Sequence, residues 1–298
     1  MIDVFDAVAV ARLSPVAAVD ALEAALLAGL DPDADPPRSA LPTGAGELLV
    51  MPAARPEGIG VKLATVGGDP RVQGVYVLFD LDTLAPVALL DGIALTNLRT
   101  AAVSALAVRH LARPDARRLL VFGTGPQARA HIAAVRAVRP IAEVDVVARD
   151  VARGREFASA VGAVAVAADP DAVSEADVIL CCTTAREPLF DGRSVTPGAA
   201  VVAIGSHEPA AREVDEALAH AAAVVVESRA VALREAGDVI QAGLAEADLI
   251  TLAEVVRGEQ TLDLDRPRLF KSVGMAWEDL VVARAVVASH GAENGVQD

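Results

Sequence analysis

Residues 119–150 constrain the fold more than any other part of the chain. They begin with an apolar run, Leu119 to Phe122, and continue through a glycine-containing turn into a segment of helical periodicity that reaches about Val138. They end on a second β-type run, Val144 to Val147. The pattern predicts a strand, a glycine turn, a helix and a second strand, the unit from which doubly wound α/β sheets are built.

The glycine turn carries the chemistry of this unit. Gly123 allows a tight bend, Gly125 allows the backbone to approach a pyrophosphate, and Ala128 replaces a third glycine while staying small enough for close packing of helix on strand. The helix that follows presents free N–H groups and a positive dipole end, and a proline in its first turn costs little. The sequence therefore predicts a dinucleotide site at Gly123, Thr124, Gly125, Pro126, Gln127 and Ala128.

The end of the second strand bears on which dinucleotide is bound. A carboxylate at this point binds the ribose hydroxyls of NAD, but here Val147 is followed by Ala148, Arg149 and Asp150. An arginine with no acid before it suits the 2′-phosphate of NADP. We therefore expect NADP(H) to be preferred and NAD(H) to be possible. The alternative is that Arg149 is a solvated loop residue and Asp150 caps the next helix.

Strands and helices alternate over the rest of this region, which predicts a parallel sheet covered on both faces. We expect strands at 119–122, 144–148, 163–167, 177–182, 199–203 and 223–226, and helices at 126–138 and 151–161. Before it we expect a helix from Ser14-Pro15 to Gly29, a meander of strands at 47–51, 59–65, 75–79 and 87–90, and a helix at 95–111. After residue 226 we expect helices, the last at 275–289.

Length and charge narrow the class of protein. A chain of 298 residues is long enough for two domains, and 53% hydrophobic residues indicate a folded protein. The formal charge of −15 argues against a nucleic-acid or anionic-membrane partner. The N-terminus has no basic leader pattern and no apolar run approaches a membrane span, so we expect a cytoplasmic protein. Adjacent Cys181 and Cys182 are expected to be buried thiols, and we expect no metal site.

Three cations occupy unusual positions. Lys62 lies in the apolar run 60–64, Arg99 in an alanine-rich segment that we expect to begin a helix, and Arg38 follows two prolines. Cations beside apolar segments need a counter-charge, which a carboxylate-bearing substrate could supply. For each cation taken alone, snorkelling to solvent or an internal salt bridge would be sufficient. The residues by themselves therefore leave two explanations open, a substrate carboxylate and an internal structural role such as a salt bridge.

Several short motifs occur in a fixed order. They are Gly-Val-Lys at 60–62, Leu-Asp-Gly at 90–92, Leu-Arg-Thr-Ala-Ala at 98–102, Gly-Thr-Gly-Pro-Gln-Ala at 123–128, Thr-Thr-Ala-Arg-Glu-Pro at 183–188, Ala-Ile-Gly-Ser at 203–206, Glu-Ala-Gly-Asp at 235–238 and Leu-Phe-Lys-Ser-Val-Gly at 269–274. Together they resemble the ornithine cyclodeaminase/mu-crystallin family over nearly the whole chain.

The resemblance implies an α/β protein of two domains that forms a homodimer. A Rossmann-type doubly wound sheet domain, residues 117–274, would be inserted into a smaller α+β substrate-binding and dimerisation domain, residues 1–116 plus 275–298. It also implies a small-molecule substrate, with Arg38, Lys62 and Arg99 holding its carboxylate. Further cofactor contacts implied by the resemblance are Thr100, Thr183, Thr184, Ser206, Lys271, Val273 and Gly274.

One departure from the family pattern bears on the reaction. Cyclodeaminases have an Asp two residues after the glycine that matches Gly205, whereas this chain has His207 there. A histidine cannot supply a fixed negative charge for a substrate ammonium group. Glu208 or Asp215 could substitute from nearby. The Gly-Ser-x-x-Pro form at 205–209 is closer to the branch that reduces ketimines and pyrroline-carboxylates.

The leading hypothesis is therefore NAD(P)H-dependent reduction of a cyclic imino acid. The substrate would be Δ1-pyrroline-2-carboxylate or Δ1-piperideine-2-carboxylate, and the product proline or pipecolate. Lys62 is the first candidate proton donor, because burial and two arginines would lower its pKa, and His207 is the second. The alternatives, in order, are an ornithine cyclodeaminase with bound NAD, an alanine dehydrogenase-like enzyme, and a non-catalytic small-ligand binder.

Overall fold

The structure is a computed structural model that describes residues 2–294. The described residues form two compact units: unit one comprises residues 2–103 and 275–294, and unit two is Ser104–Gly274. The division falls inside helix α3 (Gly92–Leu111), whereas the predicted domain boundary lies beyond the end of that helix. The assignment of substrate and cofactor roles to two domains stays a prediction.

Unit one contains a six-stranded sheet in the order β1-β6-β5-β4-β3-β2. The predicted antiparallel meander is confirmed, and its strands are β3 (Gly46–Arg55), β4 (Gly58–Val66), β5 (Val72–Phe79) and β6 (Pro86–Asp91). Two further strands, β1 (Asp3–Phe5) and β2 (Ser39–Thr43), were not predicted. The first has only three residues and the second is exposed throughout, so neither shows the alternation of a half-buried strand.

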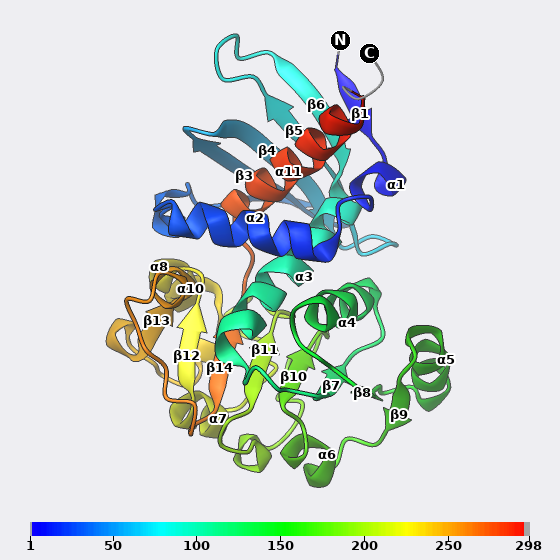
Figure 1. The fold of residues 1–298 in the computed structure, drawn as a ribbon, viewed down its shortest axis with the longest axis vertical. Coiled ribbons are helices and arrows are strands. Elements are labelled where there is room, and N and C mark those ends of the chain that lie inside the picture. The colour runs from blue at the N-terminus through cyan, green and yellow to red at the C-terminus, as the bar shows by residue number, and fades with distance from the viewer. Residues whose placement is uncertain (1, 295–298) are drawn as a thin grey trace. The chain divides into compact units, whose positions relative to one another are not determined.

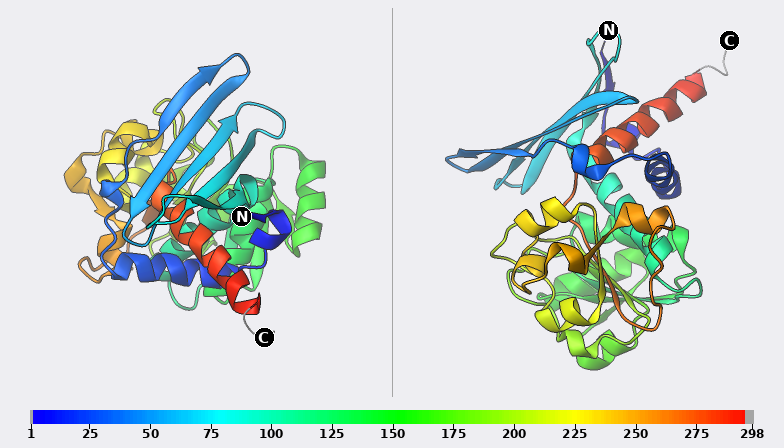
Figure 2. Two further views of the ribbon diagram at one scale, coloured as in Figure 1. Left: turned by 90° about the horizontal axis from the view of Figure 1, so that it is seen from above. Right: turned by 90° about the vertical axis from the view of Figure 1, so that its left-hand side faces the viewer.

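Helix α11 (Ala276–Asn294) packs against α2 (Pro15–Leu27) and crosses β3, β4 and β5 on one face of this sheet (Figures 1 and 2). Both helices were predicted. Helix α2 begins as its sequence indicates, with the Ser14 hydroxyl accepting from the Ala17 N–H and a proline in the first position. The short helices of the unit are α1 (Ala7–Val10) and η1 (Pro32–Ala34).

Helix α3 begins at Gly92, so the prediction that the segment around Arg99 begins a helix is wrong, and the adjacent Thr100 is no closer to the start. Both residues lie about two turns inside the helix. The carboxylate of Asp91 accepts hydrogen bonds from the N–H groups of Ile93 and Ala94 and so caps the helix earlier than expected. A Cβ on Gly92 would overlap the backbone of β5, so a glycine is required there. Because glycine is a poor helix former, the sequence does not indicate that the helix begins at this residue.

Unit two contains an eight-stranded parallel sheet in the order β13-β12-β14-β11-β10-β7-β8-β9. The strands are β7 (Arg118–Phe122), β8 (Glu143–Val147), β9 (Val164–Val166), β10 (Val178–Cys181), β11 (Ala200–Ala203), β12 (Ala223–Val226), β13 (Leu249–Thr251) and β14 (Arg268–Lys271). The helices are α4 (Pro126–Val138), α5 (Val151–Val161), α6 (Pro170–Ser174), η2 (Gly192–Ser194), α7 (Glu216–Ala221), α8 (Arg229–Glu235), α9 (Gly237–Ile240), η3 (Glu246–Asp248) and α10 (Leu252–Val256). The predicted strand–turn–helix–strand unit and parallel sheet are confirmed (Figure 1).

The expectation of only helices between residue 226 and the last helix is wrong. Strands β13 and β14 lie in this region, and β14 is inserted between β11 and β12. Its sequence, Arg-Leu-Phe-Lys, has a cation at each end, which obscures the apolar run. Both cations are buried and bind partners from other segments: Arg268 donates to the carbonyl oxygens of Leu264 and Gly198, and Lys271 pairs with Asp238.

The structure also shows the state of the two cysteines and the character of the helices. Cys181 and Cys182 are free and buried, and burial raises the pKa of both thiols well above the ordinary value. Among the helices of residues 2–294, none is long and apolar enough to cross a membrane.

Candidate active site

The glycine turn of unit two connects β7 to α4, and its two glycines are needed for different reasons. Gly123 has a φ of +118°, and a Cβ there would clash with the carbonyl oxygen of Cys182. Its N–H donates to the Val147 oxygen on the neighbouring strand, 3.0 Å away. The fold of unit two itself therefore requires glycine at this position.

Gly125 faces open space instead. A Cβ built on it would meet no atom of the described residues within 4 Å. It occupies the N-cap position of α4, and no side chain in the described structure caps the helix there. The first-turn N–H groups of α4 therefore suit an anionic ligand, and the turn fits the pyrophosphate of a dinucleotide.

The ends of neighbouring strands beyond this turn are held together by a buried carboxylate that the sequence analysis missed. Glu213 accepts hydrogen bonds from the Thr183 N–H at 2.9 Å, from the Thr183 hydroxyl at 2.6 Å and from the Gly205 N–H at 2.6 Å. Burial raises its pKa to about 7, against the Lys271 charge and these hydrogen bonds, which lower it. No local sequence pattern marks this residue, because its partners lie on two different strand ends.

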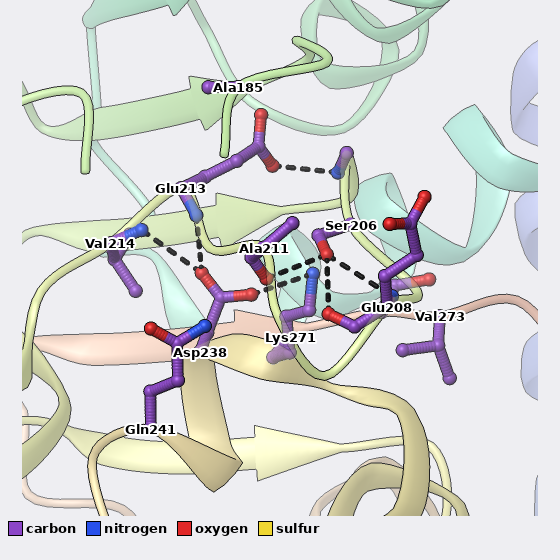
Figure 3. Close-up of polar contacts among 12 residues, drawn as sticks. Ala185, Ser206, Glu208, Ala211, Glu213, Val214, Asp238, Gln241, Lys271 and Val273 are labelled. Carbon is purple, nitrogen blue, oxygen red and sulfur yellow. Dashed lines mark hydrogen bonds and ion pairs between the residues drawn. The ribbon is translucent and has the colours of Figure 1, made fainter. Parts of the chain in front are cut away.

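A buried ion pair lies beside Glu213 (Figure 3). The Lys271 ammonium is 3.0 Å from the Asp238 carboxylate, and both side chains are fully buried. Asp238 also accepts from the backbone N–H groups of Glu213 and Val214, at 2.7 and 3.0 Å. Ser206 donates from its hydroxyl to the Ala211 oxygen at 2.7 Å. Two residues predicted to contact the cofactor, Lys271 and Ser206, therefore have structural partners within unit two.

A second buried carboxylate holds the segment that follows β14. Glu227, at the end of β12, accepts from the Ser272 hydroxyl at 2.6 Å and from the N–H groups of Val273 and Gly274 at 2.9 and 3.2 Å. The structure thus places Val273 and Gly274 at the same edge of the sheet as Thr183, Ser206 and the glycine turn. Among the other predicted cofactor residues, Thr184 is exposed in this unit and Thr100 is buried in unit one.

Two of the three unusual cations meet in unit one, where they bind a pair of acids at the start of α11. Lys62 Nζ is 2.8 Å from Asp279, and Arg99 contacts Glu278 at 2.6 Å and Asp279 at 3.2 Å. Lys62 and Arg99 are only 4% and 6% exposed, and both acids are fully buried. The internal salt bridge, one of the two explanations left open, is therefore present for these cations.

Glu278 and Asp279 were missed because the sequence predicted only that they lie in the first turn of the last helix. Adjacent acids in the first turn of a helix usually face solvent and favour the dipole. Their burial follows from the cations of β4 and α3, which are remote in sequence. The signal available in the sequence was a tryptophan, Trp277, directly before the two acids, and the structure buries this side chain.

Burial lowers the pKa of Lys62 to about 8, and the neighbouring Arg99 charge is the next largest cause. Asp279 opposes this shift, and half-buried Arg38 adds to it. Tyr76 lies opposite Lys62 on β5, and burial followed by the charge of Asp279 raises its pKa, so the phenol is neutral. At neutral pH Lys62 is therefore mainly protonated and able to give up a proton.

Comparison with known proteins identifies the family of this chain. The model of the ornithine cyclodeaminase/mu-crystallin family matches residues 1–294. The chain belongs to this family. The family resemblance, the fold and the description as an oxidoreductase with a Rossmann-type domain are confirmed.

Three members of the ornithine cyclodeaminase/mu-crystallin family show how similar this chain is. It is 38% identical to the ketimine reductase mu-crystallin of Rattus norvegicus over 255 residues, which covers 82% of this chain and 80% of the relative. It is 36% identical to a Δ1-pyrroline-2-carboxylate reductase of Bacillus cereus over 258 residues, with 79% of each covered. The structure of the Thermococcus litoralis Δ1-pyrroline-2-carboxylate reductase in complex with NADH and L-proline has a TM-score of 0.90, 28% identity and 98% coverage of both chains.

The position that departs from the cyclodeaminase pattern is His207. His207 is half-buried in the turn after β11. Glu208 forms an ion pair with Arg186 at 2.9 Å, and Asp215 caps α7 while also accepting from the Gly192 N–H. Both carboxylates that could replace the missing Asp have other partners. Within the described residues, no group of three or more His, Cys, Asp or Glu side chains could hold a metal ion.

Proposed function

We propose that this member of the family is an NAD(P)H-dependent reductase of cyclic imino acids, forming proline from Δ1-pyrroline-2-carboxylate or pipecolate from Δ1-piperideine-2-carboxylate. The observation that carries the proposal is the buried group of Lys62 and Arg99 on the acid pair of α11. It supplies a proton donor beside a guanidinium that can bind a carboxylate. The similar ketimine and Δ1-pyrroline-2-carboxylate reductases support it.

The three cations would position the substrate by its carboxylate. Charge-assisted hydrogen bonds from Arg38, Lys62 and Arg99 would fix the ring in one orientation, which lowers the entropy cost of reaching the transition state. Glu278 and Asp279 hold the Arg99 guanidinium from two sides, so its plane is set before substrate arrives. These acids also explain how buried cations are tolerated.

Lys62 would supply the proton. A reduced nicotinamide cofactor, when bound, would supply hydride for C2 of the imine, and the imine nitrogen must carry a proton for the product amine to form. With a pKa of about 8, Lys62 is protonated at neutral pH and can give that proton to the nitrogen. Asp279, 2.8 Å away, holds the ammonium in place until then.

The function is tested by following the loss of reduced-nicotinamide absorbance with each imine, using NADPH and NADH side by side. Oxidation of the cofactor with formation of proline or pipecolate is the expected result. Ornithine with NAD is the control, and proline appearing there while both imines are inert would favour the cyclodeaminase. Inactivity with all substrates would reject both reactions.

The two glycines of the turn make a matched test of the cofactor site. Gly125→Val is expected to leave the thermal midpoint within about 2 °C while weakening NAD(P)H binding at least about 100-fold, because the new side chain fills only space meant for ligand. Gly123→Ala should instead lower the midpoint strongly, because its Cβ would clash with Cys182. Calorimetry and fluorescence titration measure the two effects. Unchanged cofactor binding by Gly125→Val would contradict the site.

We further propose that NADPH is preferred over NADH. Strand β8 ends without a carboxylate, Asp150 is engaged in capping α5 through the N–H groups of Ala152 and Arg153, and Arg149 is exposed. This leaves Arg149 to bind a 2′-phosphate.

Arg149→Ala is therefore expected to raise the Kd for NADPH about 10- to 100-fold, the order of a lost charge-assisted contact, and to change the Kd for NADH less than about twofold. Arg155→Ala, which removes an exposed cation from the same helix region, is the control and should change neither. Equal weakening of both cofactors by Arg149→Ala would reject the assignment.

We also propose that a second copy of this chain covers the face of the six-stranded sheet opposite α11. Residues on one side of β3, β4 and β5 form an apolar face that is half-buried or exposed in the single chain, with Val75 43% exposed. The face comprises Leu48, Val50, Ile59, Val61, Leu63, Val75, Val77 and Phe79.

Sedimentation of the intact protein should give twice the chain mass of 30.5 kDa. Val61→Asp should shift it toward the monomer, because a charge would be buried in the interface. Val164→Asp, at an exposed valine of β9 in unit two, is the control. A monomeric native protein would contradict the proposal.

A further inference from the structure

Glu213 is a fully buried carboxylate that the proposed chemistry does not use. Figure 3 shows it beside Asp238 and Lys271, with one dashed contact from its carboxylate to a backbone nitrogen. Its two oxygens accept three hydrogen bonds, two from Thr183 and one from Gly205. A carboxylate is well suited to this position because it only accepts, whereas an amide or a carboxylic acid must also donate.

The donors lie at the ends of adjacent strands. Thr183 follows β10, Gly205 follows β11, and these strands pair directly. Strand β10 also pairs with β7, and the glycine turn after β7 packs against the backbone next to Thr183. In open parallel sheets, ligands bind beyond these carboxyl ends, so Glu213 connects two strand ends in the region proposed for the cofactor.

The close fit at Gly205 shows how tightly these groups are placed. A Cβ on Gly205 would overlap the Thr183 oxygen and approach the Glu213 carboxylate to 2.5 Å. On the other side, Asp238 holds the Glu213 backbone N–H and pairs with Lys271 at the end of β14. Glu213, Asp238 and Lys271, together with the Thr183 and Gly205 donors, form an array that joins the ends of three neighbouring strands, β10, β11 and β14.

We propose that Glu213 is a positioning residue for the nicotinamide cofactor: its carboxylate fixes Thr183 and the Gly205–Ser206 turn in the arrangement that binds the cofactor. This inference rests on the proposed function, since it concerns the same cofactor site. Glu213 acts through these neighbours and is assigned no contact with the reacting atoms. Loss of its hydrogen bonds would weaken cofactor binding before it affects the chemical step.

The array predicts a pH dependence of cofactor binding. The ionisable groups facing Glu213 are Lys271 from β14, Asp238 from α9, and Cys181 and Cys182 at the end of β10. Because the pKa of Glu213 is raised to about 7, lowering the pH through 7 protonates it and turns one acceptor oxygen into a donor. Binding to the ionised form should therefore be tightest above pH 7 and weaken as the pH falls below it.

The test is fluorescence titration of the intact protein with NADH, which lacks a titrating 2′-phosphate, between pH 6 and pH 8.5. The native protein should show a Kd that rises about 5- to 10-fold from pH 8 to pH 6. Glu213→Gln should raise the Kd at pH 8 about 10-fold and abolish this pH dependence, because the amide offers an N–H where an acceptor is needed. In steady-state kinetics, Glu213→Gln should raise the KM for the cofactor and change kcat little.

The control is Asp177→Asn, whose carboxylate also accepts from two backbone N–H groups, those of Arg117 and Arg118 at the start of β7. It should leave the Kd for NADH unchanged. Thr183→Val, which removes only the hydroxyl donor, serves as a second variant if Glu213→Gln fails to fold, and should raise the Kd about 3- to 10-fold.

A folded Glu213→Gln with native Kd and native pH dependence would overturn the positioning role. The same conclusion would follow from a flat native pH profile together with an unchanged Kd for Thr183→Val. These outcomes differ from a failure of the proposed function, in which the native protein would bind neither NADH nor NADPH at any pH.

Discussion

Arg99→Ala should lower kcat/KM for a carboxylate-bearing cyclic imine about 30- to 5,000-fold, which corresponds to about 2–5 kcal/mol for losing one partner of a desolvated charge pair. The loss would fall on KM and kcat together, because the same contact binds the ring and orients it. The substitution also leaves Glu278 and Asp279 without their guanidinium partner. We therefore expect a stability loss of about 3–5 kcal/mol, measured by denaturant unfolding.

Two comparisons separate binding from stability in this variant. The unsubstituted ring Δ1-pyrroline has the imine but no carboxylate, so Arg99→Ala should change its turnover far less than that of the 2-carboxylate. Glu278→Gln removes an acid partner and keeps Arg99, and should lose stability with a smaller loss in kcat/KM. Equal losses with both rings would mean that Arg99 acts through the fold and not on the substrate.

The second large effect is expected at Lys62. Lys62→Met should lower kcat about 100- to 10,000-fold, the usual range for removing a general acid. In the native enzyme, the rate should fall as the pH rises above about 8, because the protonated form of Lys62 is required and its pKa is lowered to about 8. Asp279 raises that pKa, so Asp279→Asn should move this alkaline limb of the pH–rate profile to lower pH.

The imine nitrogen of the substrate also titrates. Because the native and Asp279→Asn enzymes are compared with the same substrate, a shift of the alkaline limb between them comes from a group of the enzyme. Tyr76→Phe is the matched control: the phenol lies opposite Lys62, and its hydroxyl has no hydrogen-bond partner among the described residues. It should leave the limb in place. An alkaline limb at the same pH in native and Asp279→Asn enzymes would remove Lys62 from the proton step.

Local sequence determined the elements whose signals lie within a few residues. The run 119–150 specified a strand, glycine turn, helix and strand because apolar periodicity and turn glycines act locally. The meander of β3 to β6 followed from alternating strands separated by Gly, Pro and Asp turns. Lys62 and Arg99 were found because a cation in an apolar segment needs a counter-charge.

Only the tertiary structure decided where those counter-charges come from. Arg99 is 179 residues from Glu278, and no periodicity connects positions so far apart. The same holds for Glu213, whose partners lie at two strand ends, and for β14, which lies between β11 and β12 with its buried Lys271 paired to Asp238. The physical reason is that a buried charge is stable only with a partner, and the partner is chosen by proximity in space.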